Sequence, residues 1–569
     1  MKLHEDMPVM NFLEIPGESS DKVELLSGNE VLELISSKLF LEEWDELYHQ
    51  CPWATVYQRK EFVTTWYKIY HKVNLPIVVT ATYGEQLTGL LTLAINEKGL
   101  IVGAGSNQAE YHTWLSQEGD GESFIKKALL QVRKKFPGMD ISFRFVQDLT
   151  PLEWARTDPA WKNRCVLKSY DHPLIVTNEV VIAPRRNKIN RLKKQGELRF
   201  QRIVDSQDFY SIFDEIAAQY DFRKATMFNW TPFQESPLRK QFLLALFDTG
   251  LLHATVLKLN NKIIASNVGT MGNKWVHLQG INTHSPLYFK HSPGILHLQF
   301  LSKLLADEGF EIFDLTPGDN SYKEMLANKQ VVAHELIVTG SRSSYFKRMM
   351  NKKTHEYILK NKNDIFDSLG KIGINPDNTK KNLKTAIHRY RITKERIKIL
   401  RKTGVKSFLK ALTNNTGKRR KLNMYKMGLQ PGDLNVISIN QDNLSDLLRY
   451  EPEGDRITKW EFLRNAMKKF ESGYHVYTLA ANTQLLCSAW IKIQCERSTE
   501  AITQTEEVFI LHDLYCHKAY KDNLAHFITS AVSRVVADFN TNNVYATADA
   551  KDVVLCKILE TISIKPDIN

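Results

Sequence analysis

The chain has few cysteines, no cysteine pair at metal-ligand spacing and no long apolar run. Its six cysteines are scattered through 569 residues, too sparsely for a disulfide framework, and no two form a CxxC pair of the kind that binds zinc. No apolar run approaches the roughly 18–20 residues that span a bilayer, and no apolar region of a signal peptide follows Met1. These absences argue against a disulfide-rich secreted domain, a cysteine zinc site and a transmembrane segment. They predict a reduced, soluble, cytoplasmic protein.

The composition is that of a folded protein with several domains. Hydrophobic residues make up 43% of the chain and aromatic residues 10%, which excludes a mainly disordered polypeptide. At about 150 residues per domain, the length predicts three or four domains.

The positive charge is concentrated in one segment. Residues 341–421 contain 24 lysines and arginines against five acids, so this segment carries +19 although the whole chain carries only +12. Apolar residues at near-helical spacing between Leu383 and Leu400 predict a basic connector helix there. A solvated connector, contact with anionic lipid at the membrane surface, an anionic polysaccharide and RNA are all compatible with this charge, because cations attract any polyanion.

One sequence pattern occurs three times: an amphipathic helix followed by two apolar strands joined by a tight polar turn. The turns contain Gly84, Asn260-Asn261 and Asn482-Thr483, and glycine and asparagine tolerate the positive φ that two-residue hairpins require. Three such units in one chain predict repeated domains. The predicted helix, first strand and second strand are 61–70, 77–83 and 86–95 in the first copy, 238–247, 253–259 and 262–271 in the second, and 461–470, 474–480 and 484–493 in the third.

The second and third copies continue in the same way, with a strand, a loop, a helix and a further strand. The helix of the second copy begins at Ser292-Pro293-Gly294, where serine is a good N-cap and proline suits the first helical position. The predicted ranges are 274–280, a helix from 292 to 309 and 310–315 in the second copy, and 508–515, 523–539 and 544–548 in the third.

This order of elements resembles the GNAT acyltransferase fold, and residues 40–340 look like the CelD/BcsL group of GNAT proteins, which pair two GNAT-like halves as FemABX peptidyltransferases do. The residues that carry the resemblance are Trp44, Tyr57-Gln58-Arg59-Lys60-Glu61-Phe62 with Trp66, Ala109-Glu110-Tyr111-His112, Arg185-Arg186-Asn187-Lys188, Ser292-Pro293-Gly294, and Asp314-Leu315-Thr316-Pro317-Gly318-Asp319 with Tyr322-Lys323. The resemblance implies an α/β (α+β) fold with mixed central sheets. The predicted organisation is a flexible leader over 1–30, GNAT-like domains over 31–175 and 176–340, a basic linker over 341–425 and a degenerate GNAT-like domain over 426–569.

The resemblance also implies an acyl-CoA donor, usually acetyl-CoA, and it places the pyrophosphate at the helix start near Ser292. Backbone N–H groups at a helix start attract anions, and Gly294, Ile295 and Leu296 are expected to offer such groups, with cationic help from Lys290 and His291. An ordinary capped helix is the alternative. The sequence departs from the usual GNAT signature of Gln or Arg, two residues, then Gly-x-Gly or Gly-x-Ala.

Further site residues follow from the resemblance, each with a structural alternative. Asp314, Tyr322 and Lys323 are expected to be catalytic, as a carboxylate base, a phenol acid and a grip for an anionic group, or else to fix a turn. The residues expected to bind the acceptor are Tyr111, His112, Arg223, Trp230 and Asp319, for which a core role is the alternative. His512-Asp513 and His517 in the third copy have no third metal ligand in view, so no metal site is predicted.

The expected function is acyl transfer, N- or O-acetyl, to a cell-envelope or exopolysaccharide precursor, with a small or oligosaccharide acceptor. Transfer of an aminoacyl group from tRNA in the FemABX manner is one alternative, in which the basic segment 341–421 would hold RNA and binding would weaken steeply with salt. A non-catalytic GNAT-fold scaffold in polysaccharide biosynthesis is the other. The sequence does not identify the acceptor or the general base.

Overall fold

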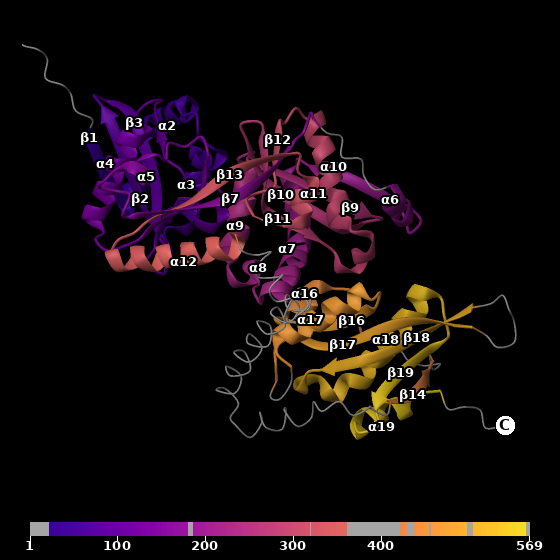
Figure 1. Cartoon of the computed structure of the whole chain (residues 1–569). Helices are drawn as coiled ribbons and strands as arrows, with labels where there is room; N and C mark the ends of the chain where they lie inside the picture. Colours follow the sequence, from indigo (N-terminus) through magenta and orange to yellow (C-terminus); the bar gives the residue numbers. More distant parts are fainter. Residues whose placement is uncertain are drawn as a thin grey trace, which may run out of the picture. The chain divides into compact units, whose positions relative to one another are not determined.

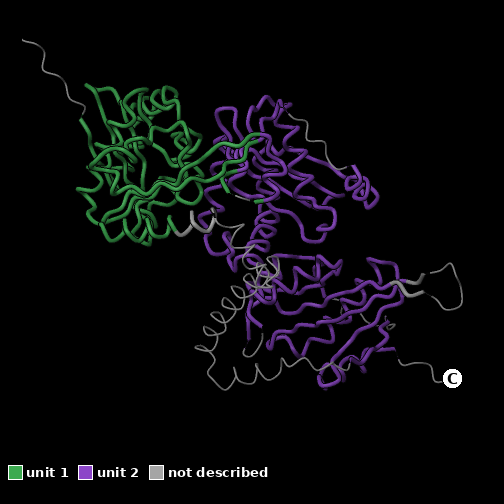
Figure 2. The backbone as a smooth tube through the Cα atoms, in the orientation of Figure 1, with its two compact units in different colours: residues 1–174, 316–320, 329–355 green, residues 175–315, 321–328, 356–569 purple. Residues whose placement is uncertain are grey.

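The computed structural model describes residues 22–179, 186–318, 320–360, 422–428, 437–453, 457–497 and 505–564. The chain divides into two compact units, shown in Figure 2. Unit 1 comprises Met1–Leu174, Thr316–Asn320 and Lys329–His355, and unit 2 comprises Ile175–Leu315, Ser321–Asn328 and Glu356–Asn569. Figure 1 labels the helices and strands.

Unit 1 contains the first copy of the repeat. Its strands lie in the order β1-β2-β3-β4-β6-β13-β7. Their bounds are β1 Lys22–Ser27, β2 Leu75–Tyr83, β3 Gln86–Ile95, β4 Ile101–Gly103, β6 Ile141–Gln147, β13 Lys329–Val338 and β7 Cys165–Val176, and the main helices are α2 Lys38–Gln50, α3 Lys60–Tyr70 and α4 Gly121–Lys135.

Unit 2 contains the second and third copies, with strand orders β12-β11-β10-β9-β8 and β14-β19-β18-β17-β16-β15. The second copy consists of α6 Arg186–Lys193, β8 Leu198–Ile203, α7 Ser206–Phe228, α9 Pro237–Asp248, β9 Leu252–Leu259, β10 Lys262–Gly272, β11 Trp275–His284, the 3-10 turn η3 Pro286–His291, α10 Pro293–Asp307, β12 Ile312–Asp314 and α11 Ser321–Leu326. The third consists of β14 Leu422–Met427, β15 Asn440–Gln441, α16 Leu444–Leu448, α17 Lys459–Glu471, β16 His475–Ala481, β17 Gln484–Arg497, β18 Thr505–Cys516, α18 Leu524–Phe539, β19 Val544–Asp549 and α19 Val553–Ile562.

All three copies share one topology, so the predicted internal repeat is confirmed. In each copy three antiparallel pairings are followed by one parallel pairing, which joins β4 to β6, β11 to β12, and β18 to β19. Parallel neighbours need a crossover connection, and α4, α10 and α18 provide it. The predicted hairpin turns are confirmed as well, because Gly84, Asn260 and Asn482 have φ of 61°, 53° and 52°.

Two predictions about individual segments need correction. The leader predicted over residues 1–30 includes Lys22–Ser27, which instead form β1 and pair with β2 from Ile77 to Thr82. Ser292 does not cap α10 with its side chain, because it adopts a left-handed conformation with φ 53° and ψ 53°. Of the basic segment, only α12 (Arg342–Lys360) is described, and the helix predicted between Leu383 and Leu400 lies outside the described residues.

The third copy packs against α7 inside unit 2. A hydrophobic cluster combines Phe222 and Ala225 of α7 with buried residues of the third copy, among them Leu463, Phe470 and Trp490. The indole N–H of Trp460 also donates to the Thr226 carbonyl at 3.1 Å. Helix α7 therefore contributes to the core of both copies, and this contact positions the residues of a pocket described below.

Candidate functional site

The start of α10 is surrounded by positive charge. Lys188 and Arg191 come from α6, and Lys290 and His291 end the turn η3 that precedes the helix. Burial, together with the nearby Arg191, Lys188 and Lys290, lowers the pKa of His291. The Lys188 ammonium donates to the Ser292 hydroxyl. Among the described residues no carboxylate pairs with Lys188, Arg191 or Lys290. The site therefore has uncompensated positive charge suited to an anion.

The His291 ring adds an unused hydrogen-bond donor. The side-chain amide of Gln195 donates to Nε2 of His291 at 3.2 Å. The ring hydrogen of the neutral imidazole consequently lies on Nδ1. This nitrogen is buried and has no hydrogen-bond partner among the described residues, so it is free to donate to an acceptor oxygen.

The predicted cradle of backbone N–H groups is only partly present. The amides of Ile295 and Leu296 both point at the Ser292 carbonyl, at 3.1 and 3.2 Å, so the expectation that they are free is wrong. They complete the first helical turn instead. Gly294 remains, and its missing side chain matters, since a Cβ there would lie 3.0 Å from Nδ1 of His284. An anion at this helix start would be held mainly by side chains.

Arg223 and Tyr322, predicted on different elements, come together in unit 2 near the end of β11. The Arg223 guanidinium donates to the Asn282 carbonyl at 3.1 Å. Burial raises the pKa of Tyr322 while the positive charge of Arg223 lowers it. Burial and Arg223 also lower the pKa of His284, which lies beside Gly294, to about 4. Arg223 thus connects Tyr322 to the strand end that faces the start of α10.

Asp314 and Lys323 are buried, which argues against the direct catalytic roles predicted for them. Strand β12 follows β11 in parallel only from Trp275 to His277, where Asp314 lies opposite His277. The Asp314 carboxylate accepts from Nδ1 of His277 at 2.7 Å, and both side chains are almost fully buried. Lys323 is only 4% exposed. The structure fits the alternative role, in which Asp314 fixes the strand end.

The remaining predicted acceptor residues are not gathered around this site. Trp230 follows the end of α7 and is partly exposed, and Asp319 lies outside the described residues. Tyr111 and His112 belong to unit 1 and are both buried. The Tyr111 hydroxyl bonds Nε2 of His172 at 2.8 Å. Direct contact of Tyr111 or His112 with an acceptor is therefore not supported.

In the third copy, the residues considered as metal ligands have other partners. His512 lies 3.3 Å from Asp513, which also pairs with Lys469 at 2.6 Å. The hydrogen bond from His512 and the Lys469 ammonium hold the pKa of Asp513 well below its usual range. His517 pairs with Glu453 at 2.6 Å. Within the described ranges, no group of three or more His, Cys, Asp or Glu side chains is arranged to hold a metal ion.

The sequence interpretation missed two features of unit 2. Lys188 was noted only as part of a motif. Its contact with Ser292 was missed, because the two residues lie far apart in the sequence. The pair formed by His475 and Asp442 was not anticipated, and the segments around them carry no motif that reveals it. Both features depend on contacts between residues 33 or more positions apart.

Comparison with known families finds a match for the second copy. A family model described as "Acetyltransferase (GNAT) domain" matches residues 185–324, the range that contains α6, the start of α10 and Tyr322. This part of the chain is similar to acetyltransferase domains of the GNAT superfamily, and the mixed α/β fold predicted from the sequence is confirmed. The narrower CelD/BcsL assignment stays a prediction. A search of curated proteins finds no match.

Several solved structures resemble about half of this chain. FemX is 9% identical and matches 54% of this chain and 97% of its own, with a TM-score of 0.39. A tandem GNAT protein from the clavulanic acid biosynthesis pathway is 13% identical over 56% of this chain and 99% of its own, with a TM-score of 0.35. The C-terminal domain of a putative lysylphosphatidylglycerol synthetase from Agrobacterium fabrum is 12% identical over 54% of this chain and 94% of its own, with a TM-score of 0.37. Similarity at this level says nothing about the substrate. Within the described residues, no helix is both long and apolar enough to cross a membrane.

Proposed function

We propose that the chain is an acyl-CoA-dependent acyltransferase that transfers an acetyl group to an amine or hydroxyl of a cell-envelope or exopolysaccharide precursor. The observation that carries the proposal is the cationic cluster at the start of α10, inside the range matched by the acetyltransferase family. The acceptor class rests on the resemblance to CelD/BcsL proteins alone.

The residues at the start of α10 fit the pyrophosphate of an acyl-CoA. Lys188, Arg191 and Lys290 supply charge, His291 supplies an unused donor on Nδ1, and Gly294 leaves space for close approach to the backbone. The bound thioester would supply the acyl group. Tyr322 is the residue proposed to hold a proton for the leaving thiolate, because burial raises the pKa of its phenol and keeps it protonated at neutral pH.

Isothermal titration calorimetry with acetyl-CoA tests the donor site. The double variant Lys188→Met, Arg191→Met is expected to weaken acetyl-CoA binding at least tenfold and to reduce the dependence of the affinity on salt, because two phosphate-facing charges are lost. Lys303→Met removes an exposed cation of α10 that lies away from the start of this helix, and it is the control. It should leave the affinity unchanged.

The alternatives give different results in the same assay. No saturable binding of any acyl-CoA, combined with salt-sensitive retention of tRNA on a filter, would replace the proposal by aminoacyl transfer from tRNA. Binding of neither ligand would indicate a non-catalytic scaffold.

A further inference from the structure

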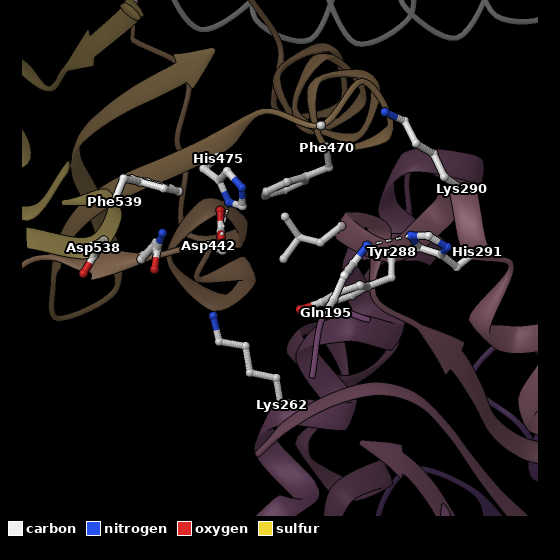
Figure 3. A pocket seen from close by; sticks show the side chains of 13 residues that line it. Gln195, Lys262, Tyr288, Lys290, His291, Asp442, Phe470, His475, Asp538 and Phe539 are labelled. Carbon is white, nitrogen blue, oxygen red and sulfur yellow. Dashed lines mark hydrogen bonds and ion pairs between the residues drawn. The ribbon is translucent and has the colours of Figure 1, made fainter. Parts of the chain in front are cut away.

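A pocket lies in unit 2, next to the end of η3. Its volume is about 490 Å³, and residues of both the second copy and the third copy line it (Figure 3). Lys290 and His291 belong to this lining and also to the cationic cluster at the start of α10. The two sites are therefore contiguous. Leu287 of η3 packs against the cluster shared by α7 and the third copy, which fixes the turn between them.

The His475 ring is held in this pocket in one orientation. The Asp442 amide donates to the Val476 carbonyl at 2.8 Å, and the Val476 amide donates to Oδ1 of Asp442 at 3.0 Å. These two hydrogen bonds to Val476 direct Oδ2 of Asp442 at Nδ1 of His475, 2.8 Å away. Since a carboxylate only accepts, Nδ1 carries a hydrogen, and in the neutral ring Nε2 carries the lone pair. The side chain is 30% exposed, and among the described residues Nε2 has no partner.

Two lysines and two carboxylates lie on the pocket wall, and the carboxylates are the groups that have partners within the described residues. Asp442 is committed to His475 and Val476, and Asp538 accepts from the Tyr477 hydroxyl at 2.5 Å and lies 3.3 Å from Arg534. Lys262 and Lys290 have no ion pair within the described part of the chain. Burial and the charge of Asp442 raise the pKa of Tyr288, so its phenol stays neutral.

Aromatic rings complete the pocket. The rings of Phe470, Phe539 and Tyr288 line it, and Phe539 lies with its centroid 5.8 Å from that of His475. In Figure 3, His475 and Phe470 lie across the opening from Tyr288 and Gln195. Apolar rings beside cations suit a ligand with one apolar face and a negative group.

We infer that this pocket binds the acceptor, a small anionic sugar with an amine or hydroxyl nucleophile, and that His475 is its general base. In the reaction, Nε2 of His475 takes the proton of the acceptor as the acceptor's nitrogen or oxygen bonds to the acyl carbon of the thioester. The carbon–sulfur bond breaks, and the leaving thiolate takes up the proton that Tyr322 is proposed to hold. The catalytic part rests on the proposed function, whereas the binding part does not. The third copy thereby completes the active site.

Binding is tested without any acyl donor. Calorimetry compares glucosamine 6-phosphate with glucosamine, which lacks the phosphate. The comparison tests whether binding requires the negative group. The wild-type protein should bind the phosphate form at least tenfold more tightly, and Lys262→Met should remove most of that preference. Lys303→Met is the control lysine variant and should not. Equal affinity for both probes, or an unchanged preference in Lys262→Met, overturns the acceptor pocket.

The role of His475 is tested by transfer from acetyl-CoA to glucosamine 6-phosphate. His475→Gln should lower kcat about 100-fold with less than a threefold change in KM. The exposed His526 gives the control variant His526→Gln, and an unchanged thermal midpoint shows that both variants fold. Wild-type kcat in His475→Gln, or no transfer by a wild-type protein that binds both substrates, overturns the base assignment. Loss of acetyl-CoA binding in the wild type rejects the proposed function while leaving the sugar-phosphate result intact.

Discussion

The imidazole of His112 has a partner on each nitrogen. The Arg144 amide donates to Nδ1 at 3.1 Å, so Nε2–H donates to the Ser106 carbonyl at 3.0 Å. Gly103 leaves room for the ring, because a Cβ there would lie 2.4 Å from it. Burial, with the Arg144 guanidinium as the second cause, lowers the pKa of His112 to about 4. The ring is therefore neutral in the folded protein at neutral pH, and its role is to hold unit 1 together.

A lowered pKa makes the stability of unit 1 sensitive to acid. The stabilising effect of neutral His112 is complete above the unfolded-state pKa of 6.5 and is lost as the pH falls towards 4. Between pH 7.5 and 5, this one group removes roughly 2 kcal/mol of unfolding free energy. His112→Gln should reduce the loss by that amount in urea unfolding at the two pH values. His526→Gln should not, and equal pH dependence in both variants would contradict the assignment.

At this scale the sequence could not identify the functional residues reliably. Asp314, Lys323, Tyr111 and His112 have chemically suitable side chains, yet their burial was invisible in a linear sequence. Burial depends on which elements cover a residue, and His277 meets Asp314 only because β11 and β12 align. Arg223 and Tyr322 were named for separate reasons, and their proximity appears only in the fold.

The hairpin turns show how local chemistry sets an element. Asn260 and Asn482 occupy equivalent turns with nearly the same positive φ. Asn260 makes two further bonds, since its amide donates to the Glu197 carbonyl at 2.7 Å and its Oδ1 accepts from the Glu197 amide at 2.9 Å. The turn of the second copy therefore depends on its side chain, in addition to its backbone conformation.

Glycine substitutions separate these two effects. Asn482→Gly should leave the thermal midpoint nearly unchanged, because glycine adopts positive φ freely. Asn260→Gly should cost about 1 kcal/mol, since it leaves the Glu197 amide without its acceptor. Differential scanning calorimetry compares them. Equal midpoints for the two variants would show that the bond from Glu197 contributes nothing.

Elements were the part of the structure that the sequence predicted best. The helix and two strands of every copy start within two residues of their expected starts, because periodicity and turn residues are local signals. The prediction that Ser292 caps α10 was wrong, because Ser292 adopts a left-handed conformation between η3 and α10. Its hydroxyl accepts a hydrogen bond from Lys188 instead. Such contacts across the fold have no local signature.

At the scale of the molecule, the sequence predicted three similar copies but did not predict that α7 joins two of them. Phe222 and Ala225 of α7 lie in the core cluster of the third copy, whereas Phe209 of the same helix stacks on Phe247 of α9 at 4.1 Å. One helix thus presents aromatic side chains to two cores. Destabilising one face should affect a different set of elements from destabilising the other.

Alanine substitutions on the two faces of α7 test this coupling by hydrogen exchange. Phe222→Ala removes a fully buried ring that meets Phe470 edge-on at 6.0 Å, and such a truncation costs about 3–5 kcal/mol. Amide protection should fall in α17 and β16 of the third copy, and so should the affinity of the pocket around His475 for glucosamine 6-phosphate. The matched variant Phe209→Ala removes an equally buried ring and should lower protection in α7, α9 and β9 first. Unchanged protection of α17 in Phe222→Ala would mean that the third copy does not depend on the Phe222 ring, and the pocket could then not depend on this contact.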